Sequence, residues 1–312
     1  MEGVPETPSP VPEVPASPFD STPIVARGDE ADLRRIAVDL AESAAAHIRA
    51  RRPEVFGSAG GHAEGAVRAK SHATDPVTIV DTEAEELIRR MLAEQRPGDP
   101  IVGEEGGGSI DDTSADTVYW VVDPIDGTVN FLYGIPGYAV SVAAMRGGRT
   151  VAGAVVDVAR AETYSAALGL GALCVGHEGT VEHLTCGSIE SLSMALVATG
   201  FAYGIYRRTE QAELVARVLP HVRDIRRFGA GALDLCHVAA GRVDAYYEHG
   251  LNVWDWGAGA LIATEAGARL TVPAATATGD DGDLVVAAAP GIADELAALL
   301  DRVGAAEPIP DR

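Results

Sequence analysis

The sequence predicts a fold that combines an α+β part with an α/β part. In the first half, β-rich segments at 118–122, 138–145, 150–159 and 162–168 are separated mostly by Gly-Gly or other short turns, which is typical of antiparallel hairpins. In the second half, short apolar strands alternate with helical segments, which is typical of α/β units. With 312 residues, 47% of them hydrophobic and 22% charged, the chain can bury two cores. We therefore expect an antiparallel-sheet domain followed by an α/β domain.

The start of the chain reads as a tail rather than as a targeting signal. Residues 1–23 contain seven prolines and several acidic residues, without a basic start followed by an apolar run. We expect a disordered proline-rich tail over residues 1–28, a metal-binding α+β domain over 29–178 and an α/β domain over 179–308 that closes the active site. No later apolar segment is long enough and free enough of charge to span a bilayer.

Helical periodicity predicts the elements of the first 100 residues. Apolar residues recur at helical spacing from Asp29 to about Arg52, which indicates an amphipathic helix. The glycine-rich stretch 57–75 favours a mobile loop or a loose hairpin. A second helix is expected to begin near Asp81, where Thr82 and Glu85 have the spacing of a capping box.

The second half of the chain is expected to alternate strictly between strands and helices. Strands are predicted at 193–200, 223–229, 243–248 and 284–289, and helices at 209–222, 231–241, 255–267 and 292–300. This order predicts a sheet with helices packed against it.

Charge and cysteine content exclude several classes of function. Acidic residues outnumber basic residues 46 to 24, and the resulting charge of −22 opposes binding to nucleic acid and to anionic membranes. Cys174, Cys186 and Cys236 are widely separated and form no CxxC pair. We therefore expect reduced thiols in a cytoplasmic protein, without a disulfide framework or a zinc site.

Four acidic residues lie where predicted strands or strand-to-helix connections end. Glu104 follows a short apolar strand, Asp123 and Asp126 follow the strand 118–122, and Asp255 lies where a strand is followed by a helix. Asp, Pro and Gly also occur in ordinary turns, so the stretch "DPIDG" alone could simply close a turn. If the four converge, their like charges require a cation, and all-oxygen ligands favour Mg²⁺ over zinc. Two or more such ions are an arrangement used in phosphoryl-group hydrolysis.

Six stretches in order resemble the inositol monophosphatase family. They are "DPVTIVD", "GEE", "DPIDGTVNF", "GYAVSVA", "RRFGAGALDLCHVAAGRVDAYYEHG" and "VWDWGAGALIATEAGA", and the resemblance covers roughly residues 30–308. It implies a layered αβαβα sandwich of the sugar-phosphatase type, a homodimer, two or three Mg²⁺ ions and sensitivity to lithium.

The resemblance also implies roles for individual residues. Thr128 and Asp81 would orient the attacking water, and Lys70 would lie beside the metals, although Asp81 could instead only cap its helix. The backbone of Gly127 and Thr128 would meet the phosphate. The implied metal ligands are Glu104, Asp123, the Ile125 carbonyl, Asp126 and Asp255, and the implied substrate contacts are Gly229, Ala230, Gly231 and Glu248.

Two departures from the family pattern stand in this sequence. Ala230 replaces the usual Thr or Ser, which removes a hydroxyl near the substrate, and Trp256-Gly257 replaces a small residue followed by Ala. Glu105 is expected to support the ligands rather than to bind metal, and His237 to be a packed structural histidine.

The resulting prediction is a Mg²⁺-dependent phosphomonoesterase that hydrolyses inositol monophosphate, a small phosphorylated polyol. The alternatives within the superfamily are phosphatases of fructose 1,6-bisphosphate, of a 3′-phosphoadenosine nucleotide or of histidinol phosphate. A regulatory protein that binds RNA polymerase or ribosome-assembly factors is the alternative from another class.

Overall fold

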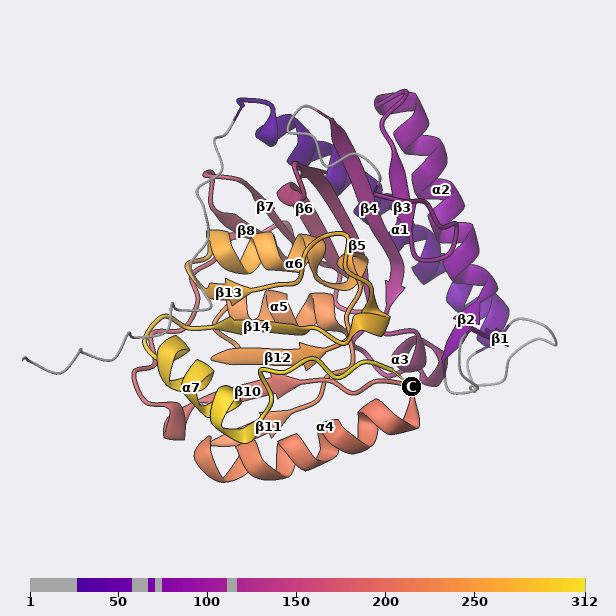
Figure 1. Ribbon diagram of the computed structural model, residues 1–312. Helices are drawn as coiled ribbons and strands as arrows, with labels where there is room; N and C mark the ends of the chain where they lie inside the picture. The colour runs from indigo at the N-terminus through magenta and orange to yellow at the C-terminus, as the bar shows by residue number, and fades with distance from the viewer. Residues whose placement is uncertain (1–26, 58–66, 71–74, 111–116, 312) are drawn as a thin grey trace, which may run out of the picture.

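The computed structural model describes residues 27–57, 67–70, 75–110 and 117–311 (Figure 1). Almost all of the predicted tail and most of the glycine-rich stretch 57–75 lie outside these residues. Strand β1 (Val67–Ala69), inside that stretch, pairs antiparallel with β2 (Pro76–Thr78), which follows it directly. No helix in the described ranges is both long enough and apolar enough to cross a membrane.

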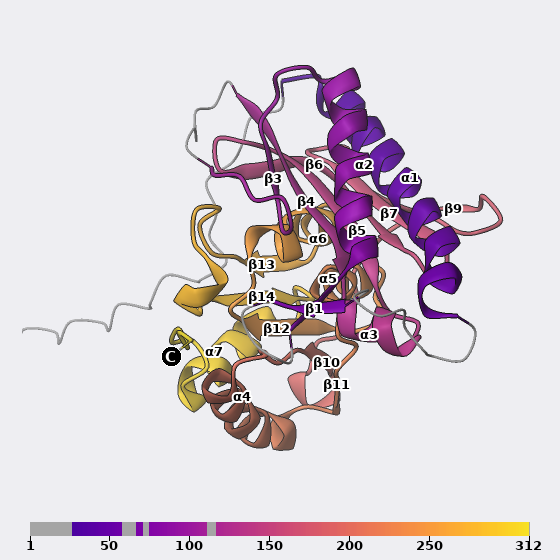
Figure 2. The same cartoon turned by 90° about the vertical axis from the view of Figure 1, so that its right-hand side faces the viewer.

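Helices and sheets alternate in layers, as Figures 1 and 2 show. Helices α1 (Glu30–Phe56) and α2 (Ile79–Gln95) cover one face of a seven-stranded sheet. Helices α5 (Gly231–Ala239) and α6 (Val253–Glu265) lie between that sheet and a five-stranded sheet. Helices α4 (Ile205–Val218) and α7 (Ala293–Val303) cover the outer face of the five-stranded sheet. The predicted αβαβα sandwich is therefore confirmed.

The seven-stranded sheet contains the predicted hairpins. Its order is β3-β4-β5-β6-β7-β8-β9, antiparallel except for the parallel pair β3–β4. The strands are β3 (Ile101–Gly103), β4 (Val118–Asp126), β5 (Ala139–Arg146), β6 (Arg149–Asp157), β7 (Glu162–Ala167), β8 (Ala172–Val175) and β9 (Val181–His183). Strand β4 continues past its predicted end through Pro124, with a bulge against β5 between Asp123 and Asp126. A bulge bends a strand and re-aims its side chains, so both aspartates can serve one site.

The five-stranded sheet follows the predicted alternation with one added strand. Its order is β11-β10-β12-β14-β13, with β10 parallel to β11 and β12, and β14 antiparallel to β12 and β13. The strands are β10 (Leu196–Thr199), β11 (Asp224–Arg226), β12 (Ala245–His249), β13 (Arg269–Thr271) and β14 (Leu284–Ala288). The short elements α3 (Thr128–Tyr133), η1 (Leu192–Met194), η2 (Leu219–His221) and η3 (Gly279–Asp281) complete the fold.

The start of α2 corrects the predicted capping pair. The helix begins at Ile79, and Thr78 and Asp81 form the capping box in place of Thr82 and Glu85. Thr78 Oγ1 accepts hydrogen bonds from the backbone of the first turn, while the Asp81 carboxylate accepts the Thr78 N–H at 3.1 Å. Glu85 instead accepts the backbone N–H groups of Glu105 and Gly106, each at 2.8 Å. It thus fastens the turn after β3 to α2.

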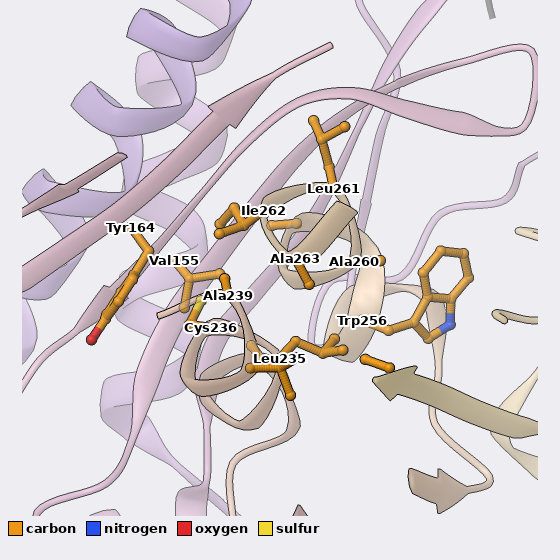
Figure 3. Packing of buried hydrophobic residues seen from close by; sticks show 14 of the residues in the cluster. Val155, Tyr164, Leu235, Cys236, Ala239, Trp256, Ala260, Leu261, Ile262 and Ala263 are labelled. Atoms are coloured by element: carbon orange, nitrogen blue, oxygen red, sulfur yellow. The ribbon is translucent and has the colours of Figure 1, made fainter. Parts of the chain in front are cut away.

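The middle layer is packed closely because small residues face it. Gly153 of β6 lies against Ala258 of α6, and a β-carbon at Gly259 would fall 2.8 Å from Leu235 Cβ. Trp256, one of the departures noted above, is buried in the same cluster as Leu235 (Figure 3). The close packing of α5 against α6 fixes the N-terminal ends of both helices, where the candidate site lies.

Candidate active site

A pocket of about 190 Å³ lies where β4 and β12 end and where α5 and α6 begin. Its walls include all the predicted metal ligands and substrate contacts. The predicted residues that line it are Glu104, Asp123, Ile125, Asp126, Gly127, Thr128, Gly229, Ala230, Gly231, Glu248 and Asp255. Lys70 and Asp81 do not line the pocket, but Lys70 contacts Glu104 and Asp81 contacts Thr128, which do.

Three of the aspartates are held by backbone N–H groups. Asp123 Oδ1 accepts the Ile125 N–H at 3.0 Å, inside the bulge of β4. Asp126 Oδ2 accepts the Ala232 N–H at 2.7 Å, which joins the end of β4 to the first turn of α5. The third, Asp255, completes a capping box at the start of α6, where its Oδ2 accepts the Asn252 N–H at 2.7 Å. Each carboxylate is therefore placed by the backbone.

The aspartates carry negative charge that the described residues do not balance. Burial, followed by repulsion from Glu104, Asp126 and Asp255, raises the pKa of Asp123 well above its usual value. Burial likewise raises the pKa of Asp255, and it raises the pKa of Asp126 to about 7. Buried like charges of this kind need a cation to remain ionised at neutral pH.

The donor set fits magnesium bound partly through water. All side chains in question offer oxygen, which suits a hard divalent cation. Within the described residues, no three acidic, histidine or cysteine side chains form a ready metal-binding group. Since Mg²⁺ usually keeps several waters and takes only one or two carboxylates, a wider ring of acids can still hold it.

Lys70 and the two glutamates after β3 form a separate charged group. Lys70 Nζ lies 2.7 Å from Glu104 Oε1 and 2.5 Å from Glu105 Oε1. Burial opposes the charged form of Lys70, but the two glutamates outweigh it and raise the pKa of the ammonium group. Glu105 thus lies beside Glu104 and pairs with the same lysine.

Thr128 and Asp81 are in contact beneath the pocket. Thr128 Oγ1 lies 3.3 Å from Asp81 Oδ1 and 3.0 Å from the Ile125 carbonyl oxygen, so its hydroxyl can donate to either. Asp81 is completely buried, which raises its pKa to about 7. Gly127 is the N-cap of α3 and Thr128 is the first helical residue, so capping does not explain Thr128. Asp81, in contrast, both caps α2 and contacts Thr128.

Another part of the pocket wall contains small residues and the partly buried Glu248. Gly229, with φ of 95°, and Ala230 lead into α5 at Gly231. Glu248 Oε2 accepts the Tyr246 hydroxyl at 2.7 Å. Burial raises the pKa of Glu248, against the opposing effects of Tyr246 and Arg227. Gly200 lacks the side chain that would overlap the Glu248 carboxylate.

Sequence reasoning missed several residues of this wall. Tyr203, Arg227 and Asn252 also line the pocket, together with Asp75, Gly200, Phe201, Ala202, His249, Gly250, Leu251 and Trp254. Asn252 could have been found, because Asn252 and Asp255 have capping-box spacing. His237 is packed as predicted, with its ring 4.9 Å from the Phe228 ring, and burial lowers its pKa to about 4.

The chain is similar to known proteins over almost all of its described length. A sequence model of the inositol monophosphatase family matches residues 29–305. The inositol-1-monophosphatase SuhB of Mycobacterium tuberculosis is 60% identical over 286 residues, which cover 91% of this chain and 98% of that protein. The solved structure titled Mycobacterium tuberculosis SuhB matches with a TM-score of 0.76 and 54% identity, covering 90% of this chain and 100% of that chain.

More distant relatives bear another name. The Nus factor SuhB of Pseudomonas aeruginosa is 40% identical over 198 residues, which cover 62% of this chain and 71% of that protein. The family match and the mycobacterial relatives both span almost all of the folded chain. The chain is therefore a member of the inositol monophosphatase family.

Proposed function

We propose that this protein is a Mg²⁺-dependent phosphomonoesterase that converts inositol monophosphate to inositol and phosphate. One observation carries the proposal. Carboxylates whose negative charge is not balanced by the described residues lie at the same pocket as the Thr128–Asp81 pair. The mycobacterial relative named inositol-1-monophosphatase supports the choice of substrate.

The side chains divide the work between holding cations and placing the water. Glu104, Asp123, the Ile125 carbonyl, Asp126 and Asp255 would hold the cations. Two or three Mg²⁺ ions, when bound, would supply positive charge and lower the pKa of a bound water. The Thr128 hydroxyl donates a hydrogen bond to Asp81 or to the Ile125 carbonyl. Its oxygen can then accept a hydrogen bond from the attacking water. The water attacks phosphorus while the bond from phosphorus to the alcohol oxygen breaks, and one proton of the water ends on the alcohol. No protein nucleophile is required.

The remaining contacts orient the substrate. The backbone N–H groups of Gly127 and Thr128 lie at the pocket and can meet the phosphate oxygens. Glu248, together with the backbone at 229–231, faces the alcohol part of the substrate and can accept hydrogen bonds from its hydroxyl groups. Lys70 stays with Glu104 and Glu105, where it limits the repulsion between them.

A substrate panel tests the proposal. Phosphate release would be measured with Mg²⁺ from inositol 1-phosphate, fructose 1,6-bisphosphate, 3′-phosphoadenosine 5′-phosphate and histidinol phosphate. We expect the highest kcat/KM for inositol 1-phosphate. A higher value for another compound would reassign the substrate, and no release from any of them would refute the phosphatase activity.

Lithium inhibition is expected from the proposed cation site. Li⁺ is small and hard, so it can lie among the oxygens of Asp123, Asp126 and Asp255, but a single charge stabilises a leaving oxygen poorly. Initial rates measured over a lithium series at several Mg²⁺ concentrations should show Mg²⁺-dependent inhibition. Insensitivity to lithium would argue for another subfamily.

The assembly and location of the protein are part of the proposal. We infer a homodimer, which light scattering of the purified full chain would measure, and a cytoplasmic location, which the three unpaired cysteines favour. We place catalysis ahead of the role named for the Nus-factor relatives, because the carboxylates and the Thr128–Asp81 pair are both in place at the pocket.

A further inference from the structure

Two adjacent arginines at the end of β11 differ in their surroundings. Arg226 pairs with Asp224 at 2.6 Å and also donates to the Ile225 carbonyl, and it does not line the pocket. Arg227 lines the pocket and is exposed. Its guanidinium makes no hydrogen bond or ion pair with another described residue. One of the two charges is therefore already paired, and the other is available at the pocket.

The backbone around Arg227 is held firmly. The next residue, Phe228, has its carbonyl bonded by Asn130 Nδ2 at 2.8 Å and its ring packed against His237. The guanidinium lies across Gly229, where a β-carbon would overlap Arg227 Nη1. Gly229 thus leaves the space that the arginine occupies, and the site is part of the folded loop.

Arg227 lies on the side of the pocket where we place the alcohol part of the substrate. It precedes the turn 229–231 and acts electrostatically on Glu248, whose ionised form it favours. Among the described residues that line the pocket, Arg227 is the only lysine or arginine. His249 does not add a second cation there, because its ring is buried against the Ala305 carbonyl and burial lowers its pKa.

We propose that Arg227 forms an anion subsite that raises kcat/KM for a phosphomonoester when its alcohol carries a second negatively charged group in place of a neutral one. A neutral polyol needs only the hydrogen bonds of Glu248 and the backbone. A second phosphate or carboxylate would be repelled by Glu248 unless an arginine paired with it. This inference rests on the proposed phosphatase function and names a class of substrate within it.

Matched substrates that differ by one charged group test the subsite. Fructose 1-phosphate would be compared with fructose 1,6-bisphosphate, and glycerol 2-phosphate with 2-phosphoglycerate, at fixed free Mg²⁺. For at least one pair, we expect the doubly charged substrate to have about a tenfold higher kcat/KM in the wild type. The effect should be no larger because Arg227 is exposed to solvent and salt.

The variants separate the two arginines. Arg227→Gln should reduce the ratio of kcat/KM between the charged and neutral partner to about one, whereas Arg226→Gln should keep the wild-type ratio. Arg227→Lys should keep part of the preference, because lysine retains the charge but not the planar fork. A wild-type ratio near one in both pairs, or a ratio that survives Arg227→Gln, would refute the subsite alone. If fructose 1-phosphate, glycerol 2-phosphate and inositol 1-phosphate are all left unhydrolysed, the phosphatase proposal is refuted, and the subsite proposal is refuted with it.

Discussion

The two walls of the pocket are built by different means. On the wall formed by the end of β4, Asp123 is buried and Asp126 is partly buried in a bulged strand, and their oxygens accept backbone N–H groups. On the wall formed between β11 and α5, small residues from Gly229 to Gly231 leave open space, and the nearest charged side chain, Arg227, is exposed.

This difference suggests which wall determines which property. A charge fixed by the backbone cannot be relocated without moving a strand, so the β4 wall is suited to a reaction that needs fixed ligands. The turn at 229–231 belongs to neither sheet, so a side-chain change at Ala230 need not move a strand, and the turn is suited to selecting the alcohol. Changes on the β4 wall should therefore cost far more activity than changes at the turn.

The largest effect is expected for Asp123→Asn. Replacing a buried ligand by a neutral amide of the same size should lower kcat by at least ~100-fold at saturating Mg²⁺, the scale of losing one major electrostatic stabiliser. The metal-free variant should be no less stable than the wild type, because the change relieves repulsion with Glu104, Asp126 and Asp255. Initial rates at saturating Mg²⁺ measure the loss of kcat, and melting temperatures in EDTA measure the stability of the metal-free variant.

A matched control for this variant lies on the other sheet. Asp224→Asn removes an exposed carboxylate that pairs only near the surface with Arg226, so it should keep kcat within about twofold. Near-normal activity of folded Asp123→Asn would contradict the site assignment and the comparison between the walls.

Thr128→Val tests water placement separately from metal binding. Valine keeps the shape but loses the hydroxyl that contacts Asp81 and the Ile125 carbonyl. We expect kcat to fall by about 10²-fold while Mg²⁺ affinity, measured by calorimetric titration, stays unchanged. An unchanged kcat with a lowered melting temperature would show that the hydroxyl is only structural.

Most of the acids at the β4 wall could be predicted from sequence, because they follow strand ends in a spaced motif. The bulge that continues β4 through Pro124 could not, since proline and glycine in "DPIDG" equally favour a turn. The capping pair of α2 was wrong for a similar reason: Thr78–Asp81 and Thr82–Glu85 have the same spacing, and only the tertiary contact of Glu85 with the turn after β3 distinguishes them.

The wall between β11 and α5 was harder to predict from the residues themselves, since they carry no distinctive spacing. Arg227 looks like its neighbour Arg226 in the sequence, and only the fold shows that one lines the pocket while the other pairs with Asp224. The short strands β8, β9 and β13 were also missed, because three- or four-residue strands give too short a pattern.

The pH dependence of stabilisation by magnesium probes the charge on the β4 wall. In the metal-free protein, Asp81 and Asp126 have pKa values of about 7, above the value of 3.8 for an unperturbed aspartate. A carboxyl group whose pKa is raised in the folded state contributes stability while it is protonated. This contribution is complete below pH ~4 and is lost as pH rises through ~7. Bound Mg²⁺ should offset this loss, so the difference in melting temperature between Mg²⁺ and EDTA should grow from pH 5 to pH 8. A difference that is constant or shrinks would contradict the assigned ligands.

The smallest effect is expected at the turn, for Ala230→Ser. Ala230 is the N-cap of α5 but offers no side-chain hydrogen bond there, and a serine hydroxyl could accept the Leu233 N–H, since the Ala232 N–H already binds Asp126. The gain should be about 1 kcal/mol, which for a chain of this length is a rise in melting temperature of roughly 2 °C. Because the backbone of the turn would not move, we expect kcat/KM for inositol 1-phosphate to change by no more than about threefold. Calorimetry measures the melting temperature, and the substrate panel measures kcat/KM. If the ratio of kcat/KM between substrates changed more than tenfold without a gain in stability, residue 230 would contact the alcohol directly rather than shape the turn.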